Sequence, residues 1–130
     1  MTKLESLTPN LMVQDVNKTL DYYIDTLGFE LLDTNPTTGT YEWAYVKLGE
    51  VGLMFQEEAS LQKEYQELNQ QKTGGGLTLY IRVTHIQALY QDLAPKVHII
   101  KSLNKTFYNA HEFAITDPNG YILTFSELIQ

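Results

Sequence analysis

The sequence has no cysteine, few basic residues and no long apolar run. Without cysteine the chain can form neither disulfides nor thiolate metal sites. Its 9 Lys and Arg residues against 16 Asp and Glu give a formal charge of −7, which argues against a nucleic-acid partner because such a partner requires a basic face. No stretch approaches transmembrane length and the first residues lack the apolar core of a secretory signal, so we expect a cytoplasmic protein without a membrane partner.

The composition is otherwise that of one soluble globular domain. The 130 residues are 43% hydrophobic and 19% charged, and a chain of this length can bury a substantial core. The acidic balance is compatible with a cationic ligand, although an acidic surface also serves solubility alone.

The chain contains an internal repeat. Residues 7–57, shifted by 70 positions, fall on residues 77–127 without a gap. The matching pairs include Leu7 with Leu77, Thr8 with Thr78, Glu42 with Glu112, Ala44 with Ala114, Phe55 with Phe125, and Trp43 with Phe113. A solenoid needs shorter units and more of them. The repeat therefore predicts two copies of one supersecondary unit.

Each copy predicts the element order β-α-β-β-β. Residues 7–13 alternate as in a half-buried strand, Asp15 is a good helix N-cap, and Gly28 is a good helix stop. Further strands are expected over residues 29–33, 41–48 and 51–56, and in the second copy over 77–83, 97–101, 112–116 and 121–126, with a helix from Ile86 that Pro95 ends and a tight turn at Asp117–Gly120.

The predicted fold class is α+β, with two tandem modules in one domain. The first module covers about residues 4–57 and the second about 77–128. Residues 58–76 form a polar linker with good helix formers, and it ends in Gly74-Gly75-Gly76.

Two motifs and the duplication resemble a known family. Val13-Gln14-Asp15-Val16 leads to Tyr22-Tyr23 and then to Leu27-Gly28-Phe29-Glu30, and Asp117-Pro118-Asn119-Gly120-Tyr121-Ile122 lies near the C-terminus. Together they resemble the glyoxalase/bleomycin-resistance/extradiol-dioxygenase superfamily, also called vicinal oxygen chelate proteins, over nearly the whole chain. The resemblance implies two modules whose sheets form a U-shaped cleft. It says little about the individual function, because the fold hosts many chemistries.

The resemblance also implies four positions at which metal-dependent members hold a divalent ion, usually with His, Glu or Gln. The family motifs and the repeat offset place these residues there: Thr8, Met54, Thr78 and Thr124. Neutral hydroxyls and a thioether bind a hard dication weakly, so we expect no metal and no other cofactor. The three histidines have no ligand spacing, and each is expected to be structural or solvated: His85, His98 and His111.

Strand alternation predicts which side chains face the cleft. From the first module these are Thr8, Asn10, Met12, Trp43, Tyr45, Met54 and Gln56. From the second they are Thr78, Tyr80, Arg82, Glu112, Thr124 and Ser126. The set predicts a binding pocket for an aromatic or cationic organic molecule, although the same aromatic residues are also suited to filling the space between the modules. Arg82 and Glu112 are expected to pair; if they do not, Arg82 is free to meet a ligand carboxylate or phosphate.

The favoured function is that of a metal-free small-molecule-binding protein resembling bleomycin-resistance proteins, which sequesters a drug or metabolite in the cleft of a homodimer. Pro9 favours this branch, since a proline recurs early in its first strand, and proline suits an edge strand or an exchanged arm. The alternatives are a metal-dependent lyase, epoxide-opening enzyme or dioxygenase, and a metal-free isomerase with Glu112 as base. The sequence assigns no catalytic residue, and it leaves open whether the modules pair within one chain or across two.

Overall fold

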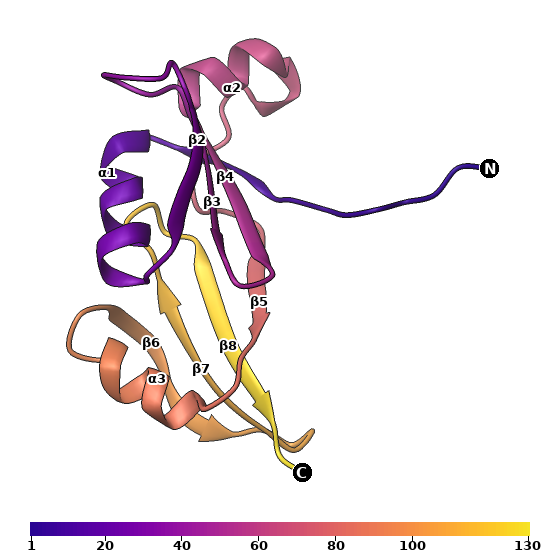
Figure 1. Cartoon of the computed structure of the whole chain (residues 1–130), viewed down its shortest axis with the longest axis vertical. Coiled ribbons are helices and arrows are strands. Elements are labelled where there is room, and N and C mark those ends of the chain that lie inside the picture. Colours follow the sequence, from indigo (N-terminus) through magenta and orange to yellow (C-terminus); the bar gives the residue numbers. More distant parts are fainter.

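The structure, a computed structural model, describes all 130 residues and contains two four-stranded sheets (Figure 1). Each sheet comes from one copy of the repeat, which confirms the predicted α+β fold of two β-α-β-β-β modules. In each sheet the first strand runs parallel to the last strand, and the other pairs are antiparallel. In spatial order the strands are β1 (Asn10–Val13), β4 (Val51–Glu57), β3 (Trp43–Leu48) and β2 (Glu30–Asn35), and then β5 (Thr78–Arg82), β8 (Ile122–Leu128), β7 (Ala110–Thr116) and β6 (His98–Lys105).

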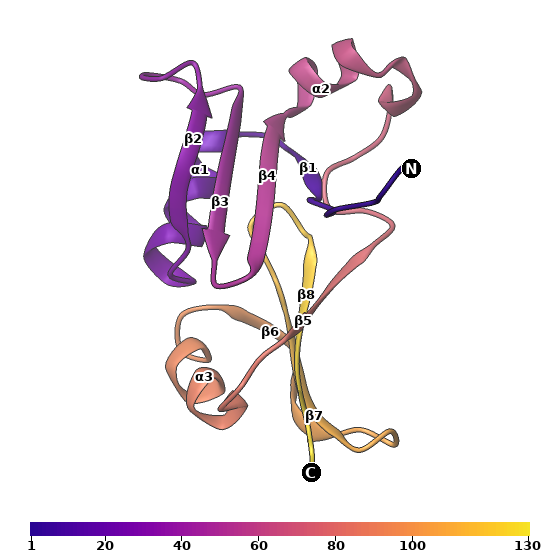
Figure 2. The same cartoon turned by 45° about the vertical axis from the view of Figure 1, so that its right-hand side comes forward.

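The helices α1 (Val16–Asp21) and α3 (Ile86–Leu93) lie on the same side of the molecule, each beside the sheet of its own module (Figure 2). Asp15 is the N-cap that the sequence predicts, because its carboxylate accepts a hydrogen bond of 3.0 Å from the Lys18 backbone N–H. A π-helical turn over Tyr22–Thr26 extends α1, and Gly28 ends it with a φ of +86°. Helix α2 (Glu58–Glu64) follows β4. None of the helices is long and apolar enough to span a membrane.

The second module has one more residue in its last hairpin than the first module has, so the repeat contains a gap. The parallel strand pairs keep the offset of 70 positions, because Leu11 lies opposite Phe55 in the first sheet and Ile81 lies opposite Phe125 in the second. In the antiparallel hairpins, however, Phe55 faces Ala44 whereas Phe125 faces Phe113. Residues of β3, which precede the hairpin turn, therefore correspond to residues of β7 that lie 69 positions later in the chain. The expected match of Trp43 with Phe113 is wrong, because Trp43 corresponds to Glu112.

The extra residue lies in the turn Asp117–Tyr121, and this turn joins the modules. Within it, the Asp117 carboxylate accepts hydrogen bonds from the backbone N–H groups of Asn119 and Tyr121, at 2.8 and 2.9 Å. Its other oxygen accepts a bond of 2.7 Å from the Tyr23 hydroxyl of the first module. The Tyr121 hydroxyl donates to the Met12 carbonyl at 2.6 Å. The turn predicted from sequence is thus also the polar contact between the modules.

The buried carboxylate at this junction is held by several donors. Burial raises the pKa of Asp117, although the hydrogen bonds from Tyr23 and from the turn backbone oppose that shift. Hydrogen bonds to charged groups contribute about 1.5–3 kcal/mol each, so the Tyr23 hydroxyl is a substantial part of the attachment.

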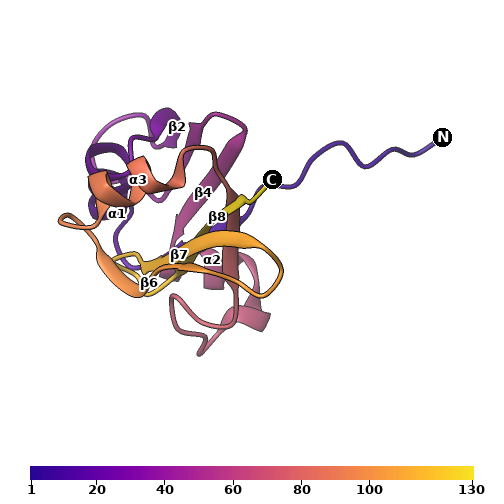
Figure 3. The same ribbon diagram turned by 90° about the horizontal axis from the view of Figure 1, so that it is seen from below.

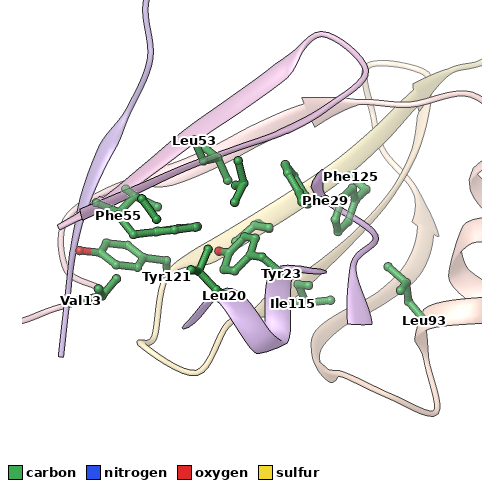
Figure 4. Packing of buried hydrophobic residues seen from close by; sticks show 14 of the residues in the cluster. Val13, Leu20, Tyr23, Phe29, Leu53, Phe55, Leu93, Ile115, Tyr121 and Phe125 are labelled. Carbon is green, nitrogen blue, oxygen red and sulfur yellow. The ribbon is translucent and has the colours of Figure 1, made fainter. Parts of the chain in front are cut away.

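One hydrophobic core runs through both modules on the helix side of the sheets (Figure 4). Tyr23 packs against Phe55 and Phe29, with ring centroids 4.7 and 5.6 Å apart. Phe125 and Ile115 continue the cluster into the second module. The cluster therefore includes buried residues of both modules.

Residues 1–9 leave this body as an extended arm (Figure 3). The strand expected from Leu7 begins only at Asn10, because Pro9 has no backbone N–H to donate to a ladder. Leu4 and Leu7 in the arm are 95% and 86% exposed. The first module therefore carries, ahead of β1, an arm whose leucine side chains have little contact with the rest of the chain.

Gly74 offers a direct test of the junction. A Cβ at Gly74 would lie 2.4 Å from the Asn119 carbonyl oxygen and 2.8 Å from the Gly120 carbonyl carbon, both of them backbone atoms, and its φ is +84°. Gly76 has a similar φ of +79° but no atom within 4 Å of such a Cβ. We expect Gly74→Ala to cost at least about 1–3 kcal/mol from backbone strain and to cost more than Gly76→Ala, which carries the strain alone.

Urea unfolding of the two variants at pH 7 measures the difference. Equal destabilisation by both substitutions would show that the close approach of Gly74 to the turn contributes nothing.

Candidate functional site

The outer face of each sheet, the face away from the helices, carries the polar and aromatic residues of the predicted site. On β3 and β4 the helix-facing residues Ala44, Val46 and Phe55 are fully buried, and Trp43 and Tyr45 alternate with them on the outer face. The outer face of the first sheet presents Asn10, Met12, Trp43, Tyr45, Met54 and Gln56. That of the second presents Thr78, Tyr80, Arg82, Glu112, Thr124 and Ser126. Thr8 precedes β1 and lies in the arm.

Gln56 is held by helix α2 and does not point freely into a cleft. Its side-chain nitrogen donates to the Ser60 hydroxyl and to the Glu64 carboxylate, each at 3.0 Å. Its oxygen accepts a bond of 2.9 Å from the Asn10 amide. Asn10 and Gln56 therefore hold polar contacts with each other and with α2 at this end of the face.

The remainder of this face is aromatic and apolar. The ring of Tyr45 lies against Gly52, where an added Cβ would be 3.1 Å from the Tyr45 hydroxyl. Trp43, Tyr45 and Met54 are half-buried, and each keeps part of its surface exposed. This surface is suited to stacking a flat ring or to holding a cation over an aromatic face.

A carboxylate surrounded by hydroxyl groups occupies the outer face of the second sheet. Glu112 is 5% exposed, and its Oε2 accepts hydrogen bonds from the hydroxyls of Tyr80, Tyr108 and Ser126, at 2.6, 2.5 and 2.8 Å. Tyr80 is itself 53% exposed, and the ring of Phe107 packs edge-on against Tyr108, with centroids 5.0 Å apart. Exposed aromatic rings thus surround a largely buried carboxylate.

Glu112 remains ionised in these surroundings. Burial raises its pKa, but the hydrogen bonds from Tyr108, Tyr80 and Ser126 outweigh burial, and the pKa lies below that of an ordinary glutamate. The bond to Glu112 raises the pKa of Tyr108 to about 12, so the hydroxyl keeps its proton. The charge of Lys101 also lowers the pKa of Glu112, but no side-chain cation forms an ion pair with the carboxylate.

The expected pairing of Arg82 with Glu112 is wrong. The two residues lie on β5 and β7, and β8 runs between them with Ser126 opposite both. Two strand spacings amount to about 10 Å, and the hydroxyl of Tyr80 reaches the carboxylate instead. The ion pair in the structure joins Lys96 and Asp92 on the surface, and Arg82 has no acidic partner.

The residues at the four family metal positions do not fit a metal. Thr8 lies in the arm, and Met54, Thr78 and Thr124 offer a thioether and neutral hydroxyls, which are weak donors to a hard dication. No three His, Cys, Asp or Glu side chains come close enough together to hold an ion. His85 precedes α3 in a left-handed conformation, and His98 lies exposed on β6.

The single chain does not gather the predicted site residues into one pocket. A cavity of about 690 Å³ lies on the helix side between the modules, and a smaller one of about 340 Å³ lies beside the arm. Of the predicted set, only Tyr80 and Arg82 line either cavity. No outer-face side chain of one module forms a hydrogen bond with the other module. The two halves are therefore separate surfaces in one chain.

Tyr108 is the residue that sequence reasoning missed. It lies in the loop between β6 and β7, where strand alternation makes no prediction about direction. The adjacent aromatic pair Phe107-Tyr108, four positions before Glu112 in a polar loop, is the only signal that could have identified it.

Comparisons with known proteins agree with this architecture. The family profile described as Glyoxalase/Bleomycin resistance protein/Dioxygenase superfamily matches residues 4–125. A search of curated proteins found no match.

Among solved structures, a protein of unknown function from Agrobacterium tumefaciens is similar at 24% identity with a TM-score of 0.80, over 99% of this chain and 98% of that one. The bleomycin-binding protein of Streptomyces verticillus, solved with copper(II)-bleomycin, is 24% identical over all of both chains with a TM-score of 0.67. The antibiotic-binding protein TnmS3 of Streptomyces sp. CB03234 is 20% identical over 99% of each chain with a TM-score of 0.76.

The Glu112 cluster predicts a specific pH dependence. Because the pKa of Glu112 is lowered on folding, its contribution to stability is present above the pKa of an ordinary glutamate and is lost as the pH falls through the folded value. The stability difference between the wild type and Glu112→Gln should therefore shrink as the pH falls from 7 to 3. Asp117 and Glu127 titrate in both proteins, so their effects cancel in this difference.

Chemical denaturation of both proteins across that pH range provides the measurement. A difference that does not change with pH would mean that the hydroxyl groups do not favour the ionised carboxylate.

Proposed function

Because the chain belongs to the Glyoxalase/Bleomycin resistance protein/Dioxygenase superfamily, we propose that it is a small-molecule-binding protein that sequesters an aromatic, cationic ligand in the cleft of a homodimer. The observation that carries the proposal is the ionised Glu112 among exposed aromatic rings, with no side chain forming an ion pair with it. Two proteins of similar structure, a bleomycin-binding protein and an antibiotic-binding protein, support a small molecule as the partner.

The ligand chemistry follows from the two outer faces. Trp43 and Tyr45 provide a half-exposed aromatic surface on the first face, suited to a flat ring. On the second face, Glu112 attracts a cationic group, and the rings of Tyr80 and Tyr108 stabilise that cation further through their π faces. A ligand with a planar part and an amine or guanidine would satisfy both faces at once.

Two copies are needed to bring these faces together. The outer faces share no hydrogen bond within one chain, and the polar contacts between the modules lie at the turn beside α1 and β1. The extended arm supports the same arrangement, since Leu4 and Leu7 gain hydrophobic stabilisation only by packing on another molecule. We therefore propose that the first module of one copy faces the second module of its partner.

The enzymatic alternatives receive less support. A metal-dependent lyase or dioxygenase would need ligands that Thr8, Met54, Thr78 and Thr124 do not provide. A metal-free isomerase would need Glu112 as a base, but three donors on Oε2 lower its pKa and make it a weak base. No catalytic residue is assigned, and the chain requires no cofactor for binding.

Trp43 is the only tryptophan, so its emission reports on the proposed cleft. We expect an aromatic cation, with bleomycin among the compounds screened, to quench or shift that emission and to raise the melting temperature. Trp43→Ala should weaken binding by about 1–3 kcal/mol, from lost stacking and buried area. Tyr65→Ala, which removes an exposed aromatic side chain just beyond α2, should leave the affinity unchanged; binding is measured by calorimetry.

Elemental analysis of protein purified without chelator checks the rival class. About one transition metal per chain, lost in a Met54→Ala, Thr124→Ala variant, would overturn the binding-protein proposal.

The arm predicts how the dimer is held. Sedimentation equilibrium at micromolar concentration should give twice the chain mass for the wild type, and Leu7→Asp should shift the protein towards monomer because a charge replaces a buried side chain at the contact. Ser6→Asp adds the same charge to the same exposed arm without removing an apolar group, and it should remain a dimer. A wild-type monomer, or equal dissociation by both variants, would contradict the role of the arm.

A further inference from the structure

We propose that the cavity between the modules on the helix side is a second binding site, which takes a small amphiphilic carboxylate. Its volume of about 690 Å³ is within the range of small-molecule sites. Most of its lining is hydrophobic, with Leu27 and Phe29 from the first module and Val83, Leu89, Leu93 and Phe125 from the second. The apolar body of the ligand would occupy this space.

Arg82 lies on the outer face of the second sheet and also lines the cavity, but the other walls of the cavity are separate from the outer faces. Leu89 and Leu93 belong to α3, and Leu27 follows the π-helical turn after α1, so these walls lie on the helix side of both sheets. Trp43, Tyr45 and Glu112 do not line it. A ligand in this cavity would therefore leave the proposed dimer cleft free, and the two sites can be tested independently.

Arg82 gives the cavity its preference for an anion. It is the last residue of β5, where the outer face of the second sheet meets the cavity, and it is exposed and has no carboxylate within salt-bridge distance. A guanidinium binds a carboxylate through two parallel charge-assisted hydrogen bonds. Thr84, two residues further along, adds a hydroxyl donor to the same lining.

Glu50 lines the same cavity and opposes an anionic ligand. It forms no ion pair with Arg82, so it does not neutralise the guanidinium by direct contact. The balance of the two charges makes a clear prediction: removing Arg82 should weaken the binding of a carboxylate, and removing the charge of Glu50 should strengthen it. An uncharged ligand of the same length should respond to neither change.

Calorimetric titration of the intact protein with octanoate, octanol and octylammonium tests the site. We expect one octanoate per chain, weaker binding of octanol and the weakest binding of octylammonium. Arg82→Met should weaken octanoate by about tenfold or more and leave octanol within about twofold, since only the charged head meets the guanidinium. Glu50→Gln should tighten octanoate alone.

Two further variants separate the cavity from general charge effects. Lys105→Met removes the same charge from exposed β6 and should change none of the affinities. Leu89→Trp should weaken octanoate and octanol together by about tenfold or more, because the larger side chain fills the space. If Leu89→Trp fails to fold, Val83→Phe replaces it.

Three results would overturn the proposal. The first is octanoate binding that is equal in the wild type and Arg82→Met, and the second is the absence of saturable binding at millimolar octanoate. The third is a gain in octanoate affinity on Leu7→Asp, which would mean that the arm of a second copy, and not a carboxylate, occupies the cavity.

Discussion

The hydrogen bonds of the Asp117–Tyr121 turn hold the two modules in one orientation, and the direction of each outer face depends on that orientation. The shared core on the helix side is large, but hydrophobic contact is non-directional and does not by itself select one angle between two sheets. The bond from the Tyr23 hydroxyl to the buried Asp117 and the bond from the Tyr121 hydroxyl to the Met12 carbonyl are directional and connect distant parts of the chain. Gly74 brings the linker against the same turn, where no larger residue fits.

Much of the fold could be predicted because local signals agreed with the long-range repeat. The cap at Asp15, the stop at Gly28 and the turn at Asp117–Gly120 each follow from the backbone preferences of single residues. The one-residue insertion could not be predicted, because two identities, Glu42 with Glu112 and Ala44 with Ala114, favour an alignment without a gap. Only the pairing of the strands shows that these identities do not correspond in the structure.

The sequence predicted which side chains of the candidate site lie on the outer faces, but not which neighbours those side chains contact. Strand alternation places Trp43, Tyr45 and Glu112 on the outer faces, as the structure does. It does not indicate which neighbour a side chain meets: Glu112 bonds the hydroxyls of Tyr80 and Tyr108, and Arg82 lies two strands away. Arg82 lies between an apolar cavity and the outer face, and this position depends on how the two modules pack together. No local sequence pattern predicts that packing.

In the proposed dimer, each ligand cleft joins the first module of one chain to the second module of its partner. A mixed dimer of a Trp43→Ala chain with a Glu112→Gln chain tests it most directly, titrated by calorimetry with the compound that quenches Trp43 emission in the wild type. If the clefts form across the dimer, one cleft carries both substitutions and the other carries neither, so half of the sites should bind with wild-type affinity. If every site in the mixed dimer is weakened and none has wild-type affinity, each cleft lies within one chain and the proposed cleft across the dimer is wrong.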